Sequence, residues 1–346
     1  MKRISEEDLL HIYNNTQNLW DALRNKSIFI TGATGFFGRW LLESFLFINN
    51  KLSLNARICG LSRNPRSFLE EYPFFKDSSI NFIKGDIQTF EFPSDDYHFV
   101  IHAATDADAQ KNVENPLLML ETITIGTKRA LEFAQKKSIE SFLFTSSGAV
   151  YGKQPSTVTH IKENEGYAVD INNPQSAYAE GKRLAELYCS IYFSHYQLPV
   201  KIARCFAFVG PYLPLNKHYA IGNFILNTLK GEDIIIKGDG TPYRSYLYAA
   251  DLTIWLWTIL LKGENNTPYN VGSDEDYDLK TIANLFTDIN PSITVNILSK
   301  SDLNKPVERY VPDITSIQQR LGLRVELNLL EGIKRTLAFY KTFTPI

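Results

Sequence analysis

The sequence predicts an α/β protein with a Rossmann-like, doubly wound parallel sheet and a smaller C-terminal lobe. Short apolar runs alternate with amphipathic helical stretches up to about residue 205, a pattern typical of parallel strands covered by helices. After Gly210-Pro211 the segments become shorter, turns are frequent and aromatic residues are dense. We therefore expect a helical N-terminal extension over 1–25, the parallel-sheet domain over 26–205 and, interleaved with it, the smaller lobe over 206–346.

The expected elements of the sheet domain follow one another in chain order. Ile28-Phe29-Ile30 is a short β-branched and aromatic run, so it is predicted to be a buried strand. From Phe36 onward the apolar residues recur at helical spacing. Further strands are expected at Ala56–Leu61, before Lys84, at Phe99–Ala104 and at Phe142–Ser147, and further helices at Pro116–Gln135 and Ala177–Phe193.

Three glycines lie at the first strand-to-helix turn, in the order Gly32-x-x-Gly35-x-x-Gly38. A residue without a Cβ allows a tight bend and a close approach of a ligand to the backbone. The free N–H groups at a helix start, together with the helix dipole, favour a pyrophosphate. The position between a strand and a helix favours a dinucleotide site over an ordinary glycine turn. The expected cofactor contacts are Gly32, Thr34, Gly35, Phe36, Phe37 and Gly38.

The end of the second strand bears on which dinucleotide binds. An NAD site usually carries an acid there for the ribose 2′-hydroxyl, whereas this segment reads Leu61-Ser62-Arg63. Guanidinium forms forked hydrogen bonds with phosphate, so Arg63 favours NADP(H) over NAD(H), and a solvated surface arginine is the alternative. Asp86 and Ile87 are expected near the adenine, although a turn aspartate fits the spacing equally well. Ala103 and Ala104 are expected at the ribose–pyrophosphate edge, and the neighbouring His102 is expected to be packed rather than catalytic.

Composition excludes several classes of partner. Lys and Arg number 36 against 38 Asp and Glu, so no charge field favours nucleic acid or an anionic membrane. No apolar run is long enough for a membrane span, and the charged, amphipathic N-terminus lacks the apolar region of a secretion signal. Cys59, Cys189 and Cys205 are few and widely spaced, which indicates a reducing compartment without a disulfide framework or a metal site. We therefore expect a cytoplasmic protein.

A second motif, Tyr178-x-x-x-Lys182, opens the last helix predicted in the sheet domain. The two residues are four apart, so both project from one helix face. A lysine ammonium close to a tyrosine favours the phenolate, which suits proton exchange with a carbinol or carbonyl oxygen. Thr145-Ser146-Ser147 ends an apolar strand and supplies hydroxyls to position that oxygen. An isolated Tyr-x-x-x-Lys match is more often a solvated helix face, but behind a dinucleotide turn it indicates hydride and proton transfer.

With these motifs in this order, the chain resembles the extended short-chain dehydrogenase/reductase family, in particular its nucleotide-sugar epimerase, dehydratase and reductase branch. The resemblance covers roughly residues 26–335 and rests on TGATGFFG, GDI, HAA, TSSGAVYG, YAEGK, RCFAFVGP, RSYLYAADL and YNVGS. It implies that Ser147 orients the substrate and that Tyr178 is the catalytic acid/base. It also implies that Lys182 supports Tyr178 and holds the nicotinamide ribose.

The resemblance further implies that the C-terminal lobe binds a nucleotide-diphosphate sugar. Arg244 resembles the arginine that pairs with the sugar nucleotide's diphosphate, and Arg309 is expected to be a second such ligand, each with a loop arginine as the alternative. Asn223 is expected to contact the same diphosphate, and Phe206 the cofactor. In this family the helices equivalent to Pro116–Gln135 and Ala177–Tyr196 form a dimer interface, so a homodimer is expected, with burial against the chain's own sheet as the alternative.

Departures from the family pattern narrow the reaction. Sugar 4,6-dehydratases that resemble this chain carry Thr-Asp-Glu before Val-Tyr-Gly, and UDP-glucuronate decarboxylases keep the glutamate. The aligned residues here are Ser147-Gly148-Ala149, and neither glycine nor alanine can transfer a proton. Both reactions are therefore disfavoured. Ala207 and Ile123 stand where the family usually has asparagine, so the sugar itself stays open.

Two reactions and one non-catalytic role remain as candidate functions. The first reaction is NADPH-dependent reduction of the keto group of a nucleotide-linked deoxyhexulose, with Tyr178 as proton donor. The second is redox-neutral epimerisation of a nucleotide sugar with retained NAD(P). Arg63 favours the reductase, because a dissociable NADPH suits net reduction. A dinucleotide-binding sensor or scaffold is disfavoured because Ser147, Tyr178 and Lys182 are all present.

Overall fold

The central element of the molecule is a seven-stranded sheet in the order β11-β6-β5-β4-β1-β2-β3. The computed structural model describes residues 3–105, 109–217, 219–302 and 306–341. β1 pairs in parallel with β2 and β4, β2 pairs with β3, and β4 pairs with β5, which confirms the doubly wound Rossmann-like fold. The strands are β1 (Ser27–Thr31), β2 (Arg57–Ser62), β3 (Ile80–Lys84), β4 (Phe99–His102), β5 (Ser141–Ser147), β6 (Val200–Cys205) and β11 (Pro268–Val271).

The strand order reverses between β1 and β4, and this reversal determines where a ligand can bind. Successive strands are added on one side of β1 as far as β3 and then on the other side from β4. The loops that leave the carboxyl ends of β1 and β4 therefore diverge to opposite faces and leave a crevice between them. The glycine turn follows β1 and Ala103-Ala104 follows β4, so both predicted cofactor segments lie at this crevice.

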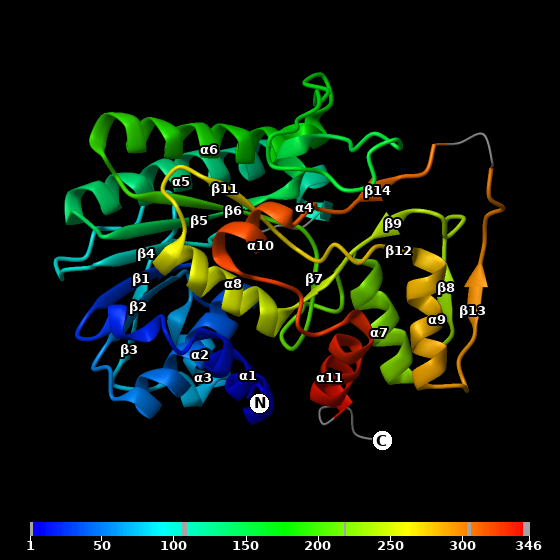
Figure 1. Cartoon of the computed structure of the whole chain (residues 1–346), viewed down its shortest axis with the longest axis horizontal. Helices are drawn as coiled ribbons and strands as arrows, with labels where there is room; N and C mark the ends of the chain where they lie inside the picture. Colours follow the sequence, from blue (N-terminus) through cyan, green and yellow to red (C-terminus); the bar gives the residue numbers. More distant parts are fainter. Residues whose placement is uncertain (1–2, 106–108, 218, 303–305, 342–346) are drawn as a thin grey trace. The chain divides into compact units, whose positions relative to one another are not determined.

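Helices connect most of the successive strands, although β4 follows β3 without one (Figure 1), and the helix ends follow local sequence signals. α5 starts with Pro116 at its first turn, where a missing N–H costs nothing, and ends at Ser138 in the left-handed region with φ 49°. α5 and α6 pack side by side in Figure 1. The helices of this part of the chain are α2 (Phe36–Leu52), α3 (Pro65–Glu71), α4 (Ala109–Glu114), α5 (Pro116–Lys137), α6 (Ala177–Tyr196) and α8 (Ala249–Lys262).

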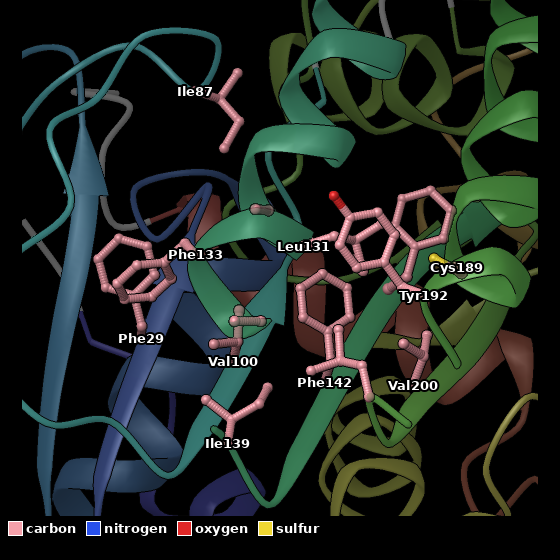
Figure 2. Packing of buried hydrophobic residues seen from close by; sticks show 14 of the residues in the cluster. Phe29, Ile87, Val100, Leu131, Phe133, Ile139, Phe142, Cys189, Tyr192 and Val200 are labelled. Carbon is pink, nitrogen blue, oxygen red and sulfur yellow. The ribbon is translucent and has the colours of Figure 1, made fainter. Parts of the chain in front are cut away.

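One large apolar cluster joins α5 and α6 to the sheet. Alternate residues of a strand point to opposite faces, so Phe29 faces this cluster while its neighbours Ile28 and Ile30 face the other side of the sheet. Phe29 packs against Phe133 of α5 with ring centroids 4.6 Å apart. Figure 2 shows Phe142 of β5 in the same cluster, together with Cys189 and Tyr192 of α6 and Val200 of β6. This packing holds α6, which carries Tyr178 and Lys182, against the sheet.

The N-terminal segment is helical and packs on the parallel-sheet part of the chain. α1 (Glu6–Thr16) is capped by Ser5, whose hydroxyl accepts from the Asp8 N–H. The Ile4 N–H donates to the Glu43 carboxylate of α2. Trp20 packs against Trp257 of α8, with ring centroids 5.1 Å apart. The described part of this segment therefore packs against α2 and α8.

The chain divides into two compact units, and each unit is built from segments that are separate in the sequence. Unit 1 comprises residues 1–150, 169–204 and 253–269, and unit 2 comprises 151–168, 205–252 and 270–346. These ranges differ from a single boundary after residue 205, because 151–168 joins unit 2 and 253–269 joins unit 1. The apolar stretch Leu252–Leu261 lies in α8, and none of the described helices is long and apolar enough to cross a membrane.

The described residues of unit 2 form three small sheets and several helices. β7 (Phe208–Val209) pairs with β10 (Leu247–Tyr248), and β8 (Ile234–Ile236) pairs with β13 (Val295–Ile297). β9 (Tyr243–Arg244) lies between β12 (Tyr277–Asp278) and β14 (Arg309–Tyr310). The helices wholly within unit 2 are α7 (Ala220–Lys230), α9 (Leu279–Ile289), α10 (Thr315–Leu321) and α11 (Leu329–Lys341).

Candidate active site

Glycine is favoured for a different physical reason at each of the three positions in the turn after β1. Gly32 has φ +71°, and a Cβ there would lie 2.5 Å from the Ala103 carbonyl oxygen. A Cβ on Gly38 would lie 2.3 Å from the Ala33 carbonyl oxygen. Gly32 therefore lets the turn pass close to the end of β4, and Gly38 lets α2 pack onto the turn.

Gly35 differs from the other two because it is exposed and has only one close neighbour. A Cβ there would meet only the Gly32 carbonyl oxygen, at 3.3 Å, and Gly35 is exposed. Gly35 caps α2, so the N–H groups of Phe36, Phe37 and Gly38 precede the first intrahelical hydrogen bond, which Arg39 donates to Gly35. Backbone N–H groups at the positive end of a long helix suit a pyrophosphate. The turn therefore fits the diphosphate of a dinucleotide, which these backbone groups would hold.

Arg39, which was not predicted from the sequence, holds this turn by hydrogen bonds. Arg39 Nε donates to the Thr34 carbonyl oxygen at 3.0 Å, and Arg39 Nη1 donates to the Tyr72 hydroxyl at 2.6 Å. The Arg39 guanidinium also lies 4.5 Å from the centre of the Tyr72 ring. Arg39 thus links Thr34 to the segment that follows α3. Its only signal in the sequence is its position directly after Gly38.

The end of β2 carries no acid. Ser62 is buried, and its hydroxyl accepts from the Asn64 N–H at 3.3 Å. Arg63 is exposed. Asp86 Oδ1 accepts from the Gln88 N–H at 2.9 Å, so Asp86 does make the turn that was its alternative interpretation. The side chain of Ile87 is buried in the apolar cluster.

The structure distinguishes the three hydroxyls that end β5. Thr145 Oγ1 donates to the His102 carbonyl oxygen at 3.1 Å, and Ser146 Oγ donates to Glu186 Oε1 at 2.5 Å. Ser147 Oγ accepts from the Ala149 N–H at 3.1 Å. Among the described residues, Ser147 is thus the one of the three with no recorded acceptor for its hydrogen. The geometry suits Ser147 for donating to a ligand oxygen.

His102 is a structural residue. Its side chain is 1 % exposed, Nδ1 lies 2.7 Å from Thr31 Oγ1, and Nε2 lies 3.1 Å from Thr127 Oγ1. Burial, and secondarily the charge of Lys182, lower the pKa of His102 to about 3. The ring is therefore neutral at physiological pH and joins β1, β4 and α5 by hydrogen bonds.

Lys182 points from α6 toward the ends of β4 and β5. Its ammonium donates to the Thr145 carbonyl oxygen at 2.8 Å and to Thr105 Oγ1 at 3.0 Å, and it lies 4.9 Å from the centre of the Phe144 ring. Tyr178, one helical turn earlier, is half-buried against the apolar cluster. Thr105 was not predicted from the sequence, although it directly follows His102-Ala103-Ala104. Unit 1 therefore contains Ser147, Tyr178 and Lys182 on adjacent elements.

The two predicted diphosphate arginines of unit 2 lie on the small sheet β12-β9-β14, but on opposite faces. Arg309 is registered with Tyr243, whereas Arg244 is registered with Tyr310 and Tyr277. Directly paired residues share a face and adjacent residues do not. The strand register, which sequence spacing does not reveal, therefore gives the two arginines different neighbours within this sheet.

The contacts of the two arginines agree with this register. Arg309 Nη1 pairs with Asp276 Oδ2 at 2.5 Å, and its guanidinium lies 4.0 Å from the centre of the Tyr243 ring. Arg244 has a longer contact with Glu308, at 3.8 Å, and is 29 % exposed. Arg309 is thus neutralised and stacked within unit 2, while Arg244 is the more available cation.

The other two predicted contact residues of unit 2, Phe206 and Asn223, lie in separate segments of its sequence. Phe206 is half-buried and packs on Tyr310, with ring centroids 4.8 Å apart. Asn223 is exposed on the first turn of α7. Phe206 shares the Tyr310 side of the small sheet with Arg244, whereas the described contacts of Asn223 do not link it to that sheet.

The parallel sheet, the glycine turn at its switch point and the Ser147, Tyr178 and Lys182 arrangement define an enzyme of the extended short-chain dehydrogenase/reductase type. The model of the NAD dependent epimerase/dehydratase family matches residues 28–272. The chain belongs to this family.

Similar proteins agree with this assignment. The chain is 28 % identical over 317 residues to UDP-glucuronic acid decarboxylase 1 of Xenopus tropicalis, covering 91 % of this chain and 72 % of that protein. The fold resembles that of UDP-glucose 4-epimerase from Thermotoga maritima, with a TM-score of 0.79, 22 % identity, and coverage of 92 % and 99 % of the two chains. It also resembles UDP-glucuronic acid 4-epimerase from Bacillus cereus, solved with UDP-glucuronic acid and NAD, with a TM-score of 0.77, 20 % identity, and coverage of 92 % and 100 %.

Proposed function

We propose that the protein is an NADPH-dependent reductase that reduces the keto group of a nucleotide-linked deoxyhexulose. The observation that carries this proposal is the set of groups around the end of β5. Ser147, Tyr178 and Lys182 supply a hydroxyl donor, a proton donor and a cation, while Gly148 and Ala149 supply no carboxylate. This set suits carbonyl reduction and lacks the second acid that elimination or decarboxylation requires.

Ser147, Tyr178 and Lys182 each have one role in the proposed reaction. Ser147 donates a hydrogen bond to the ketone oxygen and orients it. A nicotinamide held at the glycine turn would supply the hydride for the carbonyl carbon. Tyr178 donates its proton to the oxygen as the C–O double bond opens, which leaves an alcohol and a phenolate. Lys182 stabilises that phenolate electrostatically, and a proton from solvent restores Tyr178, so one NADPH and one proton are consumed for each ketone.

Substrate recognition is proposed to rest on Arg244, with Asn223 as a further contact. A guanidinium pairs well with the two negative charges of a diphosphate, and Arg244 is the less neutralised arginine of its sheet. Arg309 is proposed to hold the loop of Asp276 rather than the ligand. The relative named above, UDP-glucuronic acid decarboxylase 1 of Xenopus tropicalis, acts on UDP-glucuronic acid according to its name, which supports a nucleotide sugar as the substrate class.

The direct test is an assay with purified protein, NADPH and a panel of nucleotide-linked 4-keto sugars carrying UDP, dTDP, CDP or GDP. We expect loss of NADPH absorbance with one member of the panel and formation of one deoxyhexose product. Isomerisation of a nucleotide sugar without net NADPH consumption would instead support epimerisation. This second function is favoured by membership of a family that includes epimerases, in which the cofactor would be retained between turnovers.

Arg63 is expected to select the phosphorylated cofactor. Arg63→Ala should raise the Kd for NADPH about tenfold to a hundredfold and leave that for NADH nearly unchanged, since a hydrogen bond to a charged group contributes about 1.5–3 kcal/mol. Titration of the nucleotide fluorescence measures both constants. Arg66→Ala, an exposed arginine three residues further along, is the matched control. An equal loss for both cofactors would point to a general role of Arg63 and contradict NADP selection.

A homodimer through α5 and α6 is the proposed assembly. Leu117 and Leu118 of α5 and Leu187 of α6 are 67 %, 57 % and 54 % exposed, which leaves an apolar face open on two adjacent helices. Leu187→Asp is expected to convert a dimer to a monomer in light scattering coupled to gel filtration. Ile235→Asp, on a 53 % exposed residue of unit 2, should leave the mass unchanged. A wild-type monomer would refute the proposal.

A further inference from the structure

A nearly buried ion pair joins β6 to α6, the helix that carries Tyr178 and Lys182. Arg204 of β6 donates through Nε and Nη2 to the Glu186 carboxylate of α6, at 3.0 Å and 2.7 Å, and the two side chains are 14 % and 12 % exposed. The fork of the guanidinium engages both carboxylate oxygens and so fixes the orientation of Glu186. None of the steps proposed above uses Glu186 or Arg204.

The carboxylate also makes a contact that an ion pair alone does not require. Ser146 Oγ donates to Glu186 Oε1 at 2.5 Å. Ser146 immediately precedes Ser147, and Glu186 lies four residues after Lys182 and eight after Tyr178. Residues at these spacings share one helix face, so the contact joins the face that carries Tyr178 and Lys182 to the strand end that carries Ser147.

A second contact lies one residue earlier on β5 and one helical turn earlier on α6. Lys182 donates to the Thr145 carbonyl oxygen at 2.8 Å, just as Glu186 accepts from Ser146. Two successive contacts, Thr145 with Lys182 and Ser146 with Glu186, therefore set the position of α6 along β5. A slip of α6 by a fraction of a turn would break both and change the separation of Tyr178 from Ser147.

We propose that Glu186, held by Arg204, is a positioning residue that fixes the catalytic helix against the Ser147 strand through the Ser146 hydroxyl. This inference rests on the proposed catalytic roles of Ser147 and Tyr178. Its physical basis is that hydride and proton transfer tolerate little error in the placement of the reacting groups. Glu186 does not touch the substrate, and its effect acts through the geometry of α6 and β5.

The test compares two serines of the same strand. Ser146→Ala removes the hydroxyl that reaches Glu186, while Ser141→Ala removes a buried hydroxyl that donates to the Leu260 carbonyl oxygen at 2.7 Å from the opposite end of β5. We expect similar decreases in Tm for both variants. Only Ser146→Ala should lower kcat, by about tenfold to a hundredfold, with the KM for NADPH unchanged. Glu186→Gln, which keeps an oxygen acceptor for Ser146, should retain more kcat than Glu186→Ala.

Two outcomes would overturn the proposal. One is a Ser146→Ala variant with wild-type kcat and a Tm as low as that of Ser141→Ala, which would make the contact purely structural. The other is found by a different measurement, which is needed if the wild-type enzyme turns over no sugar of the panel. That result would contradict the proposed function rather than the positioning role. Hydrogen exchange of residues 177–182 then decides: faster exchange in Ser146→Ala than in Ser141→Ala supports positioning, and equal exchange in the two variants refutes it.

Discussion

Tyr178→Phe is expected to abolish most turnover while leaving the fold intact. The change removes only the hydroxyl, and Tyr178 is half-buried against apolar residues that accept a phenylalanine ring equally well. Loss of a general acid lowers kcat about a hundredfold to ten-thousandfold. We therefore expect that decrease in a NADPH-consumption assay, with an unchanged Kd for NADPH and an unchanged Tm.

Tyr188→Phe supplies the matched control for this prediction. Tyr188 lies on the same helix and also packs partly against the apolar cluster, but it is not part of the Tyr178-x-x-x-Lys182 motif. It should keep wild-type kcat. Full activity of Tyr178→Phe in a cell that depends on this protein would argue against catalysis and in favour of a dinucleotide-binding sensor or scaffold.

Gly38→Ala should destabilise the fold by about 1–3 kcal/mol, the usual range for forcing an added group into a packed interior. The new Cβ would lie 2.3 Å from the Ala33 carbonyl oxygen, a backbone atom that cannot rotate away. Either α2 must move or the turn must open. Urea denaturation followed by circular dichroism measures the change in the free energy of unfolding.

Gly35→Ala separates packing from ligand binding within the same turn. Its Cβ would meet only one atom, at 3.3 Å, and its φ of −80° suits any residue, so the stability cost is limited to about 1 kcal/mol or less from a poorer helix cap. NADPH binding should nevertheless weaken, because the methyl group occupies the open side of the turn. If Gly35→Ala were as destabilised as Gly38→Ala, the assignment of different roles to the two glycines would fail.

The secondary structure of the parallel-sheet domain follows well from local sequence. The run Ile28-Phe29-Ile30 lies within β1, and the stretch predicted as a helix over Ala177–Phe193 forms α6. Periodicity is a local property, so it identifies a strand or helix without knowledge of its partners. The same reasoning predicted that the glycines lie between a strand and a helix.

The use of individual polar groups could not be predicted in this way. Thr145, Ser146 and Ser147 are equivalent hydroxyls in the sequence, and only their partners on β4, on α6 and at Ala149 distinguish them. Arg244 and Arg309 each looked like a diphosphate ligand, but a register between strands distant in sequence assigns them to opposite faces. Such distinctions depend on long-range pairing, which no local pattern encodes.

The sequence alone determined the class of fold, the turn that suits a dinucleotide and the Tyr178 and Lys182 pair, because each depends on residues close together along the chain. Only the tertiary structure decided which hydroxyl beside that pair is left for a ligand and which arginine is neutralised. It also revealed the contacts of Arg39 with the glycine turn and of Glu186, on the catalytic helix, with β5. The reason is physical: a side chain's chemistry depends on the partners that satisfy it, and in a folded chain those partners come from distant segments.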